Sequence, residues 1–315
     1  MISLEPPKVS VLIPCYNAEK YIGETLESVF RQSWQEIEVI VVDDGSKDRS
    51  ADVVRSFARP NLRLIQQENR GSTVARNICR SKASGDFVQY LDADDLLEPN
   101  KIALQMERLK DGARCVASAE WGRFTDNPRE TRFAEESVWR DLSPIDWLAE
   151  SGFKMMFPAL WLIPMEIVRS VGPWNENLSL CDDMEYFTRV LLASDGIRFC
   201  PGARCHYRSG IEGSLSGAKS PQALRSQFNV LELCEGYLRT AEESERIRRC
   251  LSLAWQQFAH FAYPYDRVIS THALERAHAL HPVRIRPGGG LRFRVLSRMI
   301  GWRASRVLQV RSGRP

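Results

Sequence analysis

Apolar and polar positions alternate in two rhythms over the first hundred residues. The short, mostly apolar runs that predict strands are 9–13, 38–42, 62–65 and 87–91, and the β-branched run at 38–42 is typical of a strand buried on both faces. The segments with apolar residues at helical spacing are 17–32, 50–58 and 73–84. Strands that alternate with helices indicate right-handed βαβ units, and therefore an α/β fold with a mostly parallel, Rossmann-like sheet flanked by helices.

The pattern changes after about residue 110. Residues 120–150 are rich in Trp, Arg and Glu and are expected to form an irregular connection. The further predicted elements are a strand at 159–163 with a short helix after it, a helix at 182–192, and one or two helices over 221–262. The sequence Pro-Gly-Gly-Gly at 287–290 sets off a basic tail. If 291–310 is helical, the apolar residues that share one face are Val295, Leu296, Met299, Ile300 and Val307, with Arg303 interrupting them.

Composition places the chain among globular proteins, with 43% hydrophobic and 26% charged residues in 315. The net charge of +3 is uneven, because residues 284–315 hold nine Arg and no Asp or Glu. Residues 1–7 lack the pattern of a secretory signal, and no run approaches the ~20 apolar residues that span a bilayer, so a cytoplasmic location is expected. The eight Cys form no CxxC pair and no Cys/His ligand spacing, which predicts reduced core thiols without a zinc site or a disulfide framework.

Three carboxylates follow the predicted strand at 87–91, in the sequence Asp-Ala-Asp-Asp at 92–95. Such a cluster repels itself unless positive charge lies beside it. Oxygen ligands suit Mg²⁺ or Mn²⁺, ions that keep coordination positions open for water and substrate phosphate. We interpret the cluster as a metal–diphosphate site. The alternative is an Asp-rich cap on the next helix.

The ends of the first two predicted strands indicate a nucleotide pocket. Pro14, Tyr16 and Asp44 follow those strands, and ligands on parallel sheets bind beyond the carboxyl ends. Tyr16 can stack on a base, Asp44 can accept from a uracil-type N3–H, and Gly45 can adopt the positive φ of a tight turn. The alternative is an ordinary Asp-Gly turn. No GxGxxG follows the first strand and no Walker lysine loop is present, which argues against dinucleotide binding and P-loop ATP hydrolysis.

Two helix starts carry further candidates. Gly71 opens a helix whose free N–H groups can face an anion, and Arg76 can reach a phosphate oxygen; the alternative is a helix capped by Ser72, with Arg76 in solvent. Asp182 and Asp183 open another helix, where acidic residues usually complement the helix dipole. If the pair faces the acidic cluster, one carboxylate can serve as a general base.

His206 precedes a Gly/Ser-rich loop over 210–217. The loop can fold over a bound nucleotide, but this signal is weak. The histidine is expected to be structural or exposed.

These motifs, in this order, resemble the family 2 inverting glycosyltransferases of the GT-A fold. The matching segments are 9–17, 41–48, 71–77, 85–95, 172–176 and 182–189. The resemblance is strong over 8–100, fair over 159–208 and absent beyond about 220. It implies a GT-A domain over 1–220, with a nucleotide-sugar half at about 8–110 and an acceptor half at about 111–220. A helical C-terminal extension over 221–283 and the basic tail over 284–315 would follow.

The resemblance also implies roles for individual residues. The implied donor-binding residues are Pro14, Tyr16, Asn17, Asp44, Arg76, Asp92 and Asp94. Asp94, with Asp92, would hold Mn²⁺ or Mg²⁺ on the diphosphate. Asp183 would be the general base that takes a proton from the acceptor hydroxyl. Because the family's acidic pair is Glu-Asp and this chain has Asp-Asp, Asp182 stays an alternative base.

The implied activity is an inverting, metal-dependent transfer of one sugar from a nucleotide-diphosphate sugar, with a UDP-sugar favoured. The acceptor would be a hydroxyl of a glycan or lipid-linked precursor in cell-surface polysaccharide synthesis. The chain has no Gln-x-x-Arg-Trp sequence and no predicted membrane span, which argues against a processive synthase.

Two rival functions remain. A sugar nucleotidyltransferase predicts an early Gly-rich basic loop, whereas this chain has Pro-Cys-Tyr-Asn at 14–17. A catalytically silent relative is expected to have lost Asp94 or Asp183, and both are present. For the tail, the alternatives are contact with an anionic membrane surface, a helix packed on the body, or partial disorder. Nucleic-acid binding is not expected, because no recognition motif is present.

Overall fold

A computed structural model describes residues 6–111, 114–152, 156–211, 218–283, 285 and 290–311. The chain forms two compact units. The first comprises 1–151, 155–177 and 182–214, and the second comprises 152–154, 178–181 and 215–315. Most of the loop predicted at 210–217 and most of the Gly-rich sequence at 287–290 lie outside the described residues. The predicted domain boundaries stay a prediction.

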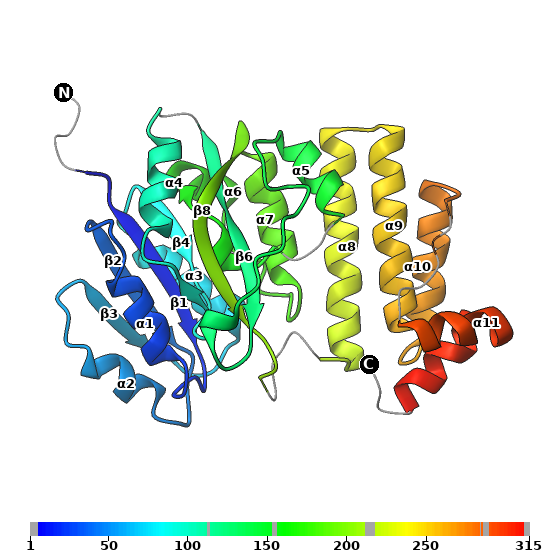
Figure 1. Cartoon of the computed structure of the whole chain (residues 1–315), viewed down its shortest axis with the longest axis horizontal. Helices are drawn as coiled ribbons and strands as arrows, with labels where there is room; N and C mark the ends of the chain where they lie inside the picture. Colours follow the sequence, from blue (N-terminus) through cyan, green and yellow to red (C-terminus); the bar gives the residue numbers. More distant parts are fainter. Residues whose placement is uncertain are drawn as a thin grey trace. The chain divides into compact units, whose positions relative to one another are not determined.

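A five-stranded sheet forms the centre of the first unit (Figure 1). Its strands, in spatial order, are β3 (Leu62–Gln66), β2 (Ile37–Asp43), β1 (Val9–Cys15), β4 (Phe87–Tyr90) and β7 (Ile163–Pro164). The first four run parallel, and β7 is antiparallel to β4. The four strands predicted from the apolar runs are therefore confirmed, and so is the mostly parallel sheet. Positions 11–13 of β1 are fully buried, as expected of a central strand covered on both faces.

Helices cover both faces of this sheet. These are α1 (Ile22–Phe30), α2 (Ser50–Ser56) and α3 (Ser72–Lys82). The strand order reverses direction after β3, so right-handed crossovers place α1 and α2 on one face and α3 on the other (Figure 1). The first helix begins later than predicted because Asn17 has a positive φ of 49° and lies in a turn. Gly71, with a φ of 96°, precedes α3, and Ser72 does not cap it.

A smaller sheet follows, where the sequence pattern predicted an irregular connection. Its strands are β5 (Leu96–Leu97), β8 (Gly196–Arg208) and β6 (Cys115–Phe124), with β6 parallel to β8. The helices of this region are α4 (Lys101–Leu109), α5 (Pro144–Ser151), α6 (Met165–Val171) and α7 (Asp182–Leu192). The irregular assignment of 120–150 was thus wrong at both ends. Small and polar residues inside β6 hide its strand pattern, since Ala117, Ser118 and Ala119 are buried by packing without forming an apolar run.

The strand predicted at 159–163 is mostly another structure. Pro158–Leu160 forms a 3₁₀ turn, Leu162 makes an isolated antiparallel bridge to Ala117 of β6, and Ile163–Pro164 pairs with β4. Pro158 suits the first position of the 3₁₀ turn, and Pro164 offers no N–H to a strand ladder, so the run forms only short pairings. The short helix after it and the helix at 182–192 are confirmed as α6 and α7.

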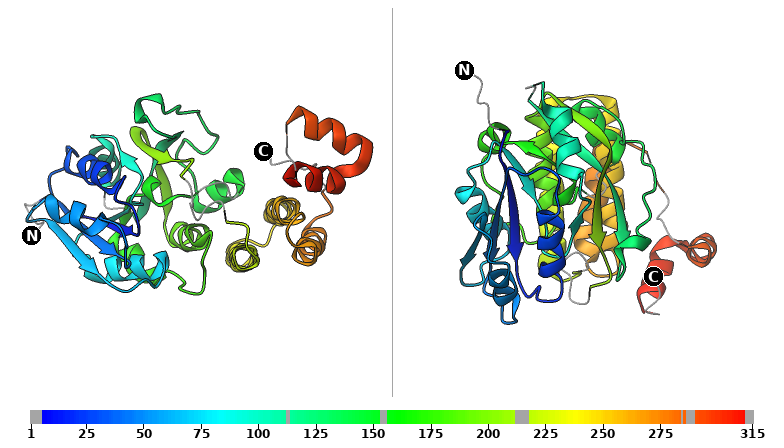
Figure 2. Two further views of the ribbon diagram at one scale, coloured as in Figure 1. Left: turned by 90° about the horizontal axis from the view of Figure 1, so that it is seen from below. Right: turned by 60° about the vertical axis from the view of Figure 1, so that its left-hand side comes forward.

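The second unit is helical. It contains α8 (Pro221–Ala241), α9 (Glu245–Ala262), α10 (Arg267–Leu280) and α11 (Leu291–Arg311). Figures 1 and 2 show α8, α9 and α10 side by side, and these helices pack on one another. The predicted region 221–262 is two helices, because Ser244 caps α9 by accepting from the Ile247 N–H. In α11, Gly301 has a φ of 79°, so the single helix expected over 291–310 is two helical segments.

All eight cysteines are free thiols, and all except Cys181 are buried. The expectation of core thiols without disulfides is confirmed. Within the described residues, no helix combines the length and the apolar content needed to cross a bilayer.

Candidate active site

Asp44 ties the end of β2 to the loop before α3. Its Oδ1 accepts from the Arg70 N–H at 2.8 Å and from Gln67 Nε2 at 2.6 Å, and its Oδ2 accepts from the Gly71 N–H at 2.8 Å. Gly45, directly after it, has a φ of 74°, and an added Cβ would lie 2.7 Å from the Asn69 backbone nitrogen. The positive φ expected of Gly45 is confirmed. The Gly71 N–H proposed to face an anion faces this carboxylate.

Asn17 joins the loops that follow β1 and β2. Its N–H donates to Ser46 Oγ at 2.9 Å, and its Oδ1 accepts from the Lys47 N–H at 2.8 Å. Tyr16, one residue earlier, is 48% exposed, so its ring is available to a ligand. Pro14 lies within β1 and pairs with β2. The structure therefore places these three predicted residues, with Asp44, at the carboxyl end of two adjacent parallel strands.

Arg76 on α3 connects two acidic segments that are far apart in the sequence. Its Nη2 lies 2.8 Å from Asp92 Oδ1, just beyond β4, and its Nη1 lies 2.5 Å from Asp182 Oδ2, the first residue of α7. The guanidinium is buried and its Nε has no hydrogen-bond partner. Burial alone would lower the pKa of Arg76, but the charges of Asp92 and Asp182 outweigh burial and raise it. Arg76 is thus a fixed cation between carboxylates.

Two stacked aromatic rings lie against the Arg76 guanidinium. The Arg76 guanidinium lies 4.6 Å from the centre of the Trp174 ring, and Trp174 stacks on Tyr186 of α7 with centroids 4.0 Å apart. Asn77 on α3 holds the Trp174 backbone at both polar groups, with N–O distances of 2.8 Å and 3.0 Å. Sequence analysis gave Asn77 and Trp174 no role. Their presence in the matching segments 71–77 and 172–176 was the available signal.

The carboxylates around Arg76 outnumber it. Burial and then the charge of Asp92 raise the pKa of Asp94 to about 6. Burial and then the charge of Asp182 raise the pKa of Asp183 to about 7. Burial also raises the pKa of Asp182, against the opposing effect of Arg76. Asp94, Asp182 and Asp183 therefore hold protons more tightly than ordinary aspartates, chiefly because they are buried.

Arg208 at the end of β8 organises the acidic loop from the other side. Its Nε donates to the Asp94 carbonyl at 3.0 Å, its N–H donates to Asp95 Oδ1 at 2.9 Å, and its guanidinium pairs with Glu24 of α1. Asp95 is fully buried, and its Oδ2 has no hydrogen-bond partner. Burial raises the pKa of Asp95 well above its ordinary value, followed by the charge of Asp94. Sequence analysis passed over Arg208 because a lone arginine at a strand end carries no pattern.

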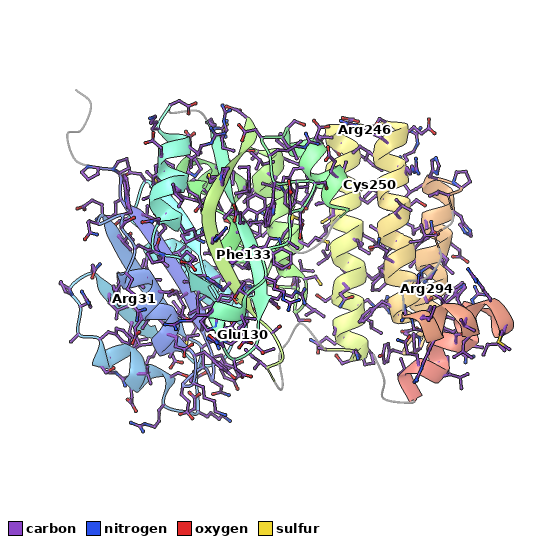
Figure 3. The ribbon with its side chains drawn as sticks, viewed as in Figure 1. Arg31, Glu130, Phe133, Arg246, Cys250 and Arg294 are labelled. Atoms are coloured by element: carbon purple, nitrogen blue, oxygen red, sulfur yellow. The ribbon has the colours of Figure 1, made fainter. Side chains whose placement is uncertain are left out.

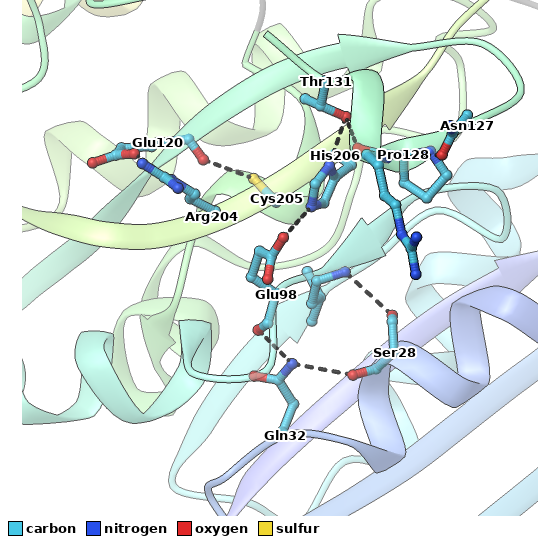
Figure 4. Close-up of polar contacts among 12 residues, drawn as sticks. Ser28, Gln32, Glu98, Glu120, Asn127, Pro128, Thr131, Arg204, Cys205 and His206 are labelled. Atoms are coloured by element: carbon cyan, nitrogen blue, oxygen red, sulfur yellow. Dashed lines mark hydrogen bonds and ion pairs between the residues drawn. The ribbon is translucent and has the colours of Figure 1, made fainter. Parts of the chain in front are cut away.

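His206, two residues earlier, is structural (Figure 4). Its Nε2 lies 2.9 Å from Glu98 Oε1 and its Nδ1 lies 2.7 Å from Thr131 Oγ1. Burial lowers the pKa of His206, and the hydrogen bond to Glu98 opposes that effect. Gln32 on α1 also donates to the Glu98 carbonyl, at 2.8 Å, so the histidine belongs to a network between α1, β5 and β8 (Figure 4).

The donor set around Asp94 suits a hard divalent cation. Asp92 and Asp94 offer oxygen ligands only, and burial followed by the charge of Asp92 raises the pKa of Asp94 in spite of Arg208 and Arg76. Among the residues that the structure describes, no group of three or more His, Cys, Asp or Glu has the arrangement of a metal site. Mg²⁺ is usually bound by one or two carboxylates, with the remaining ligands from substrate phosphate and water, so Asp92 and Asp94 could hold such an ion.

Comparison with known proteins matches residues 10–168, about half of the chain, to the family described as Glycosyl transferase family 2. Glycosyltransferase GlyA of Streptococcus pneumoniae is 31% identical over 122 residues, which are 38% of this chain and 18% of GlyA. The chain spans 18% to 60% of the length of the curated relatives compared.

Two solved structures share the fold. The Staphylococcus aureus TarS 1–349 structure has a TM-score of 0.66 at 19% identity, covering 98% of this chain and 92% of TarS 1–349. Mannosyltransferase PcManGT from Pyrobaculum calidifontis has a TM-score of 0.56 at 19% identity, covering 97% of this chain and 87% of PcManGT. The expected family and the GT-A-like fold are both confirmed.

Proposed function

Since this chain belongs to glycosyl transferase family 2, we propose that it transfers one sugar, with inversion, from a nucleotide-diphosphate sugar to an acceptor hydroxyl. The acceptor would be a glycan or a lipid-linked precursor in cell-surface polysaccharide synthesis. A divalent metal would assist the departure of the nucleoside diphosphate.

The observation that carries this proposal is the ion-pair bridge from Asp92 through Arg76 to Asp182. It joins the acidic loop after β4 to the start of α7. A donor diphosphate held at the loop and an acceptor activated at the helix would therefore meet at one place. Holding two reactants in line is the main source of acceleration available to such a displacement.

We assign the general base to Asp183 rather than Asp182. Asp182 is committed to Arg76 at 2.5 Å, and that pairing favours its ionised, weakly basic form. The carboxyl of Asp183 has no cation paired with it in the described contacts, and its pKa is raised to about 7. A base with a pKa near the working pH is the most effective at accepting a proton in the transition state. A single base suffices for a one-step inverting displacement.

On the donor side, Tyr16 and Asp44 would contact the base of the nucleotide. Tyr16 is exposed for stacking. Asp44 already accepts three hydrogen bonds, and a carboxylate has about four acceptor positions, which leaves room for one N–H from a base. Asp94 and Asp92 would hold the metal, which when bound supplies positive charge to the diphosphate leaving group.

Arg76 is assigned a different role from the one first expected. Both of its Nη groups already face carboxylates, so we propose that it positions Asp92 and Asp182. Direct contact with the diphosphate stays a prediction.

A UDP-sugar is the favoured donor. TarS has been solved with UDP-GlcNAc, and PcManGT with GDP-Man and Mn²⁺, so both nucleotides belong in a test.

The test is a donor panel. The protein would be incubated with Mn²⁺ or Mg²⁺ and with UDP-, GDP- and dTDP-sugars, and release of the nucleoside diphosphate would be followed. We expect metal-dependent release from one donor, lost in Asp94→Asn. The absence of metal-dependent turnover and of metal-dependent binding for every donor would favour a catalytically silent relative instead.

A further inference from the structure

The C-terminal helical segment presents an apolar face without a cover in the described structure. The residues of this face are Leu291, Val295, Leu296, Met299 and Ile300, all exposed, with Leu291 at 71% and Met299 at 75%. Spacings of four residues relate Leu291 to Val295, Val295 to Met299 and Leu296 to Ile300, so the set covers about half of the circumference of the first segment of α11. We call this set the α11 apolar face. Five exposed aliphatic side chains together mark an interaction site rather than ordinary surface.

Other residues of α11 anchor it to its own unit. Phe293 is 5% exposed, and its ring lies 4.7 Å from the guanidinium of Arg306 on the second segment of α11. Trp302, after the break at Gly301, packs on His260 of α9 and on Tyr263, which follows α9, with ring centroids 4.6 Å and 5.1 Å apart. The α11 apolar face therefore stays exposed on a helix that is anchored by Phe293 and Trp302.

The charge on this segment has one sign. Residues 290–311 contain six Arg and no Asp or Glu. Within the part of the chain that the structure describes, no carboxylate pairs with Arg292, Arg294, Arg298 or Arg303, all of which are exposed. Figure 3 labels Arg294 on α11. Arg294 and Arg298 flank the α11 apolar face, and Arg292 lies within it.

We propose that α11 binds peripherally to an anionic lipid surface, with its apolar face at the level of the acyl chains and its arginines at the headgroups. An apolar face combined with basic flanks is the pattern of helices that lie in the membrane interface. Each arginine near an anionic surface strengthens binding about fivefold, and the apolar side chains add affinity that does not depend on charge.

Two other partners fit the same surface less well. A nucleic acid would use the arginines, but it offers nothing that buries Leu291, Leu296 or Met299. A second copy of this chain would bring an equally basic helix, and like charges in contact oppose association. An anionic bilayer both buries apolar side chains and offers negative charge to the arginines.

The test is vesicle co-sedimentation of the full chain. Vesicles of phosphatidylcholine alone would be compared with an equimolar mixture of phosphatidylcholine and phosphatidylglycerol, at low and high salt. We expect binding to the mixed vesicles. The exposed pair Arg294→Glu/Arg298→Glu should weaken partitioning by at least about 30-fold. The matched control Arg225→Glu/Arg249→Glu reverses two exposed arginines on α8 and α9 and should change it much less.

A variant that leaves the charge unchanged distinguishes a lipid surface from a nucleic acid as the partner. Leu296→Gln/Met299→Gln removes apolar contact without changing charge and should weaken vesicle binding about tenfold or more. Circular dichroism would verify that each variant keeps its helix content. Equal pelleting with both lipid compositions, or no pelleting at all, would overturn the proposal. Binding to duplex DNA that is insensitive to Leu296→Gln/Met299→Gln, in place of vesicle binding, would assign the surface to a nucleic acid.

Discussion

Two acidic clusters lie at the carboxyl end of the same parallel sheet, and they differ in what surrounds them. Asp43 and Asp44, at the end of β2, are held by backbone N–H groups and side-chain amides. Asp92, Asp94 and Asp95, after β4, are joined by Asp182 and Asp183 of α7, and the buried cation Arg76 pairs with Asp92 and Asp182. We call the first pair the turn cluster and the second group the reactive cluster.

The difference teaches what each carboxylate does. Backbone N–H groups and one amide satisfy Asp44, so its charge holds the loop before α3 against the end of β2. Arg76 pairs with only two carboxylates of the reactive cluster, and burial, followed by the charge of a neighbouring carboxylate, raises the pKa of Asp94 and of Asp183. Crowded, buried carboxylates cost stability, and under the proposed function they would bind the metal and accept the proton.

The largest test of this comparison is removal of the proposed base. Asp183→Asn should lower kcat about 10³-fold, because an amide cannot take the proton of the acceptor. Nucleotide binding, measured by calorimetry, should stay unchanged. Asp182→Asn is the companion variant. If Asp182→Asn lost more activity than Asp183→Asn, the base would be assigned to Asp182.

The second test removes the cation of the reactive cluster. Arg76→Met should lower the free energy of unfolding by about 3–5 kcal/mol at pH 8, because it leaves the partly buried carboxylates of Asp92 and Asp182 without a partner. Urea unfolding with EDTA would measure it. The loss should shrink at lower pH, because burial raises the pKa of Asp182 and protonation removes its charge. Arg70→Met is the control at the turn cluster: only the backbone of Arg70 binds Asp44, so the change should stay within about 0.5 kcal/mol. Equal losses in the two variants would contradict the comparison.

The third test exchanges one carboxylate in each cluster for an amide. Asp44→Asn should destabilise the metal-free protein by about 1–3 kcal/mol, because an amide cannot accept at both Oδ positions. Asp94→Asn should stabilise it by about 1–3 kcal/mol at pH 8, since it removes one of several crowded charges.

The sign of the Asp94 effect depends on pH. Its pKa in the folded protein, about 6, lies above the ordinary 3.8, so the folded state favours the proton. That contribution to stability is present below pH 3.8 and is lost as the pH rises through about 6. Asp94→Asn should therefore make no difference at low pH and stabilise at pH 8. If Asp44→Asn and Asp94→Asn shifted the midpoint temperature of thermal unfolding in the same direction, the result would argue against two distinct clusters.

The smallest test is the pH profile of turnover. Protonation of Asp183, with a pKa of about 7, should lower kcat about tenfold for each pH unit below that value. Steady-state rates at saturating donor, measured between pH 5 and pH 9, would give this pH profile. About half of the measurements would lie below neutrality. A flat profile over this range would remove Asp183 as the titrating base.

The sequence determined the parallel sheet and the order of its elements by itself. Apolar runs such as 38–42 satisfy two buried faces at once, so local pattern and tertiary environment agree there. The strand-end positions of Pro14, Asp44 and Asp92 followed from that sheet, since parallel strands end at one edge. The ordered motifs alone also indicated the family.

The tertiary structure alone decided which charges meet. The bridge from Asp92 to Asp182 through Arg76 spans ninety residues of chain, and no local pattern specifies such a pairing. The strand β6 stayed hidden for a similar reason, because its buried alanine and serine positions acquire their environment only from β8 beside them. A sequence encodes periodicity directly, whereas the pKa of Asp183 depends on burial and on neighbouring charges that exist only once α3, β4 and α7 have packed together.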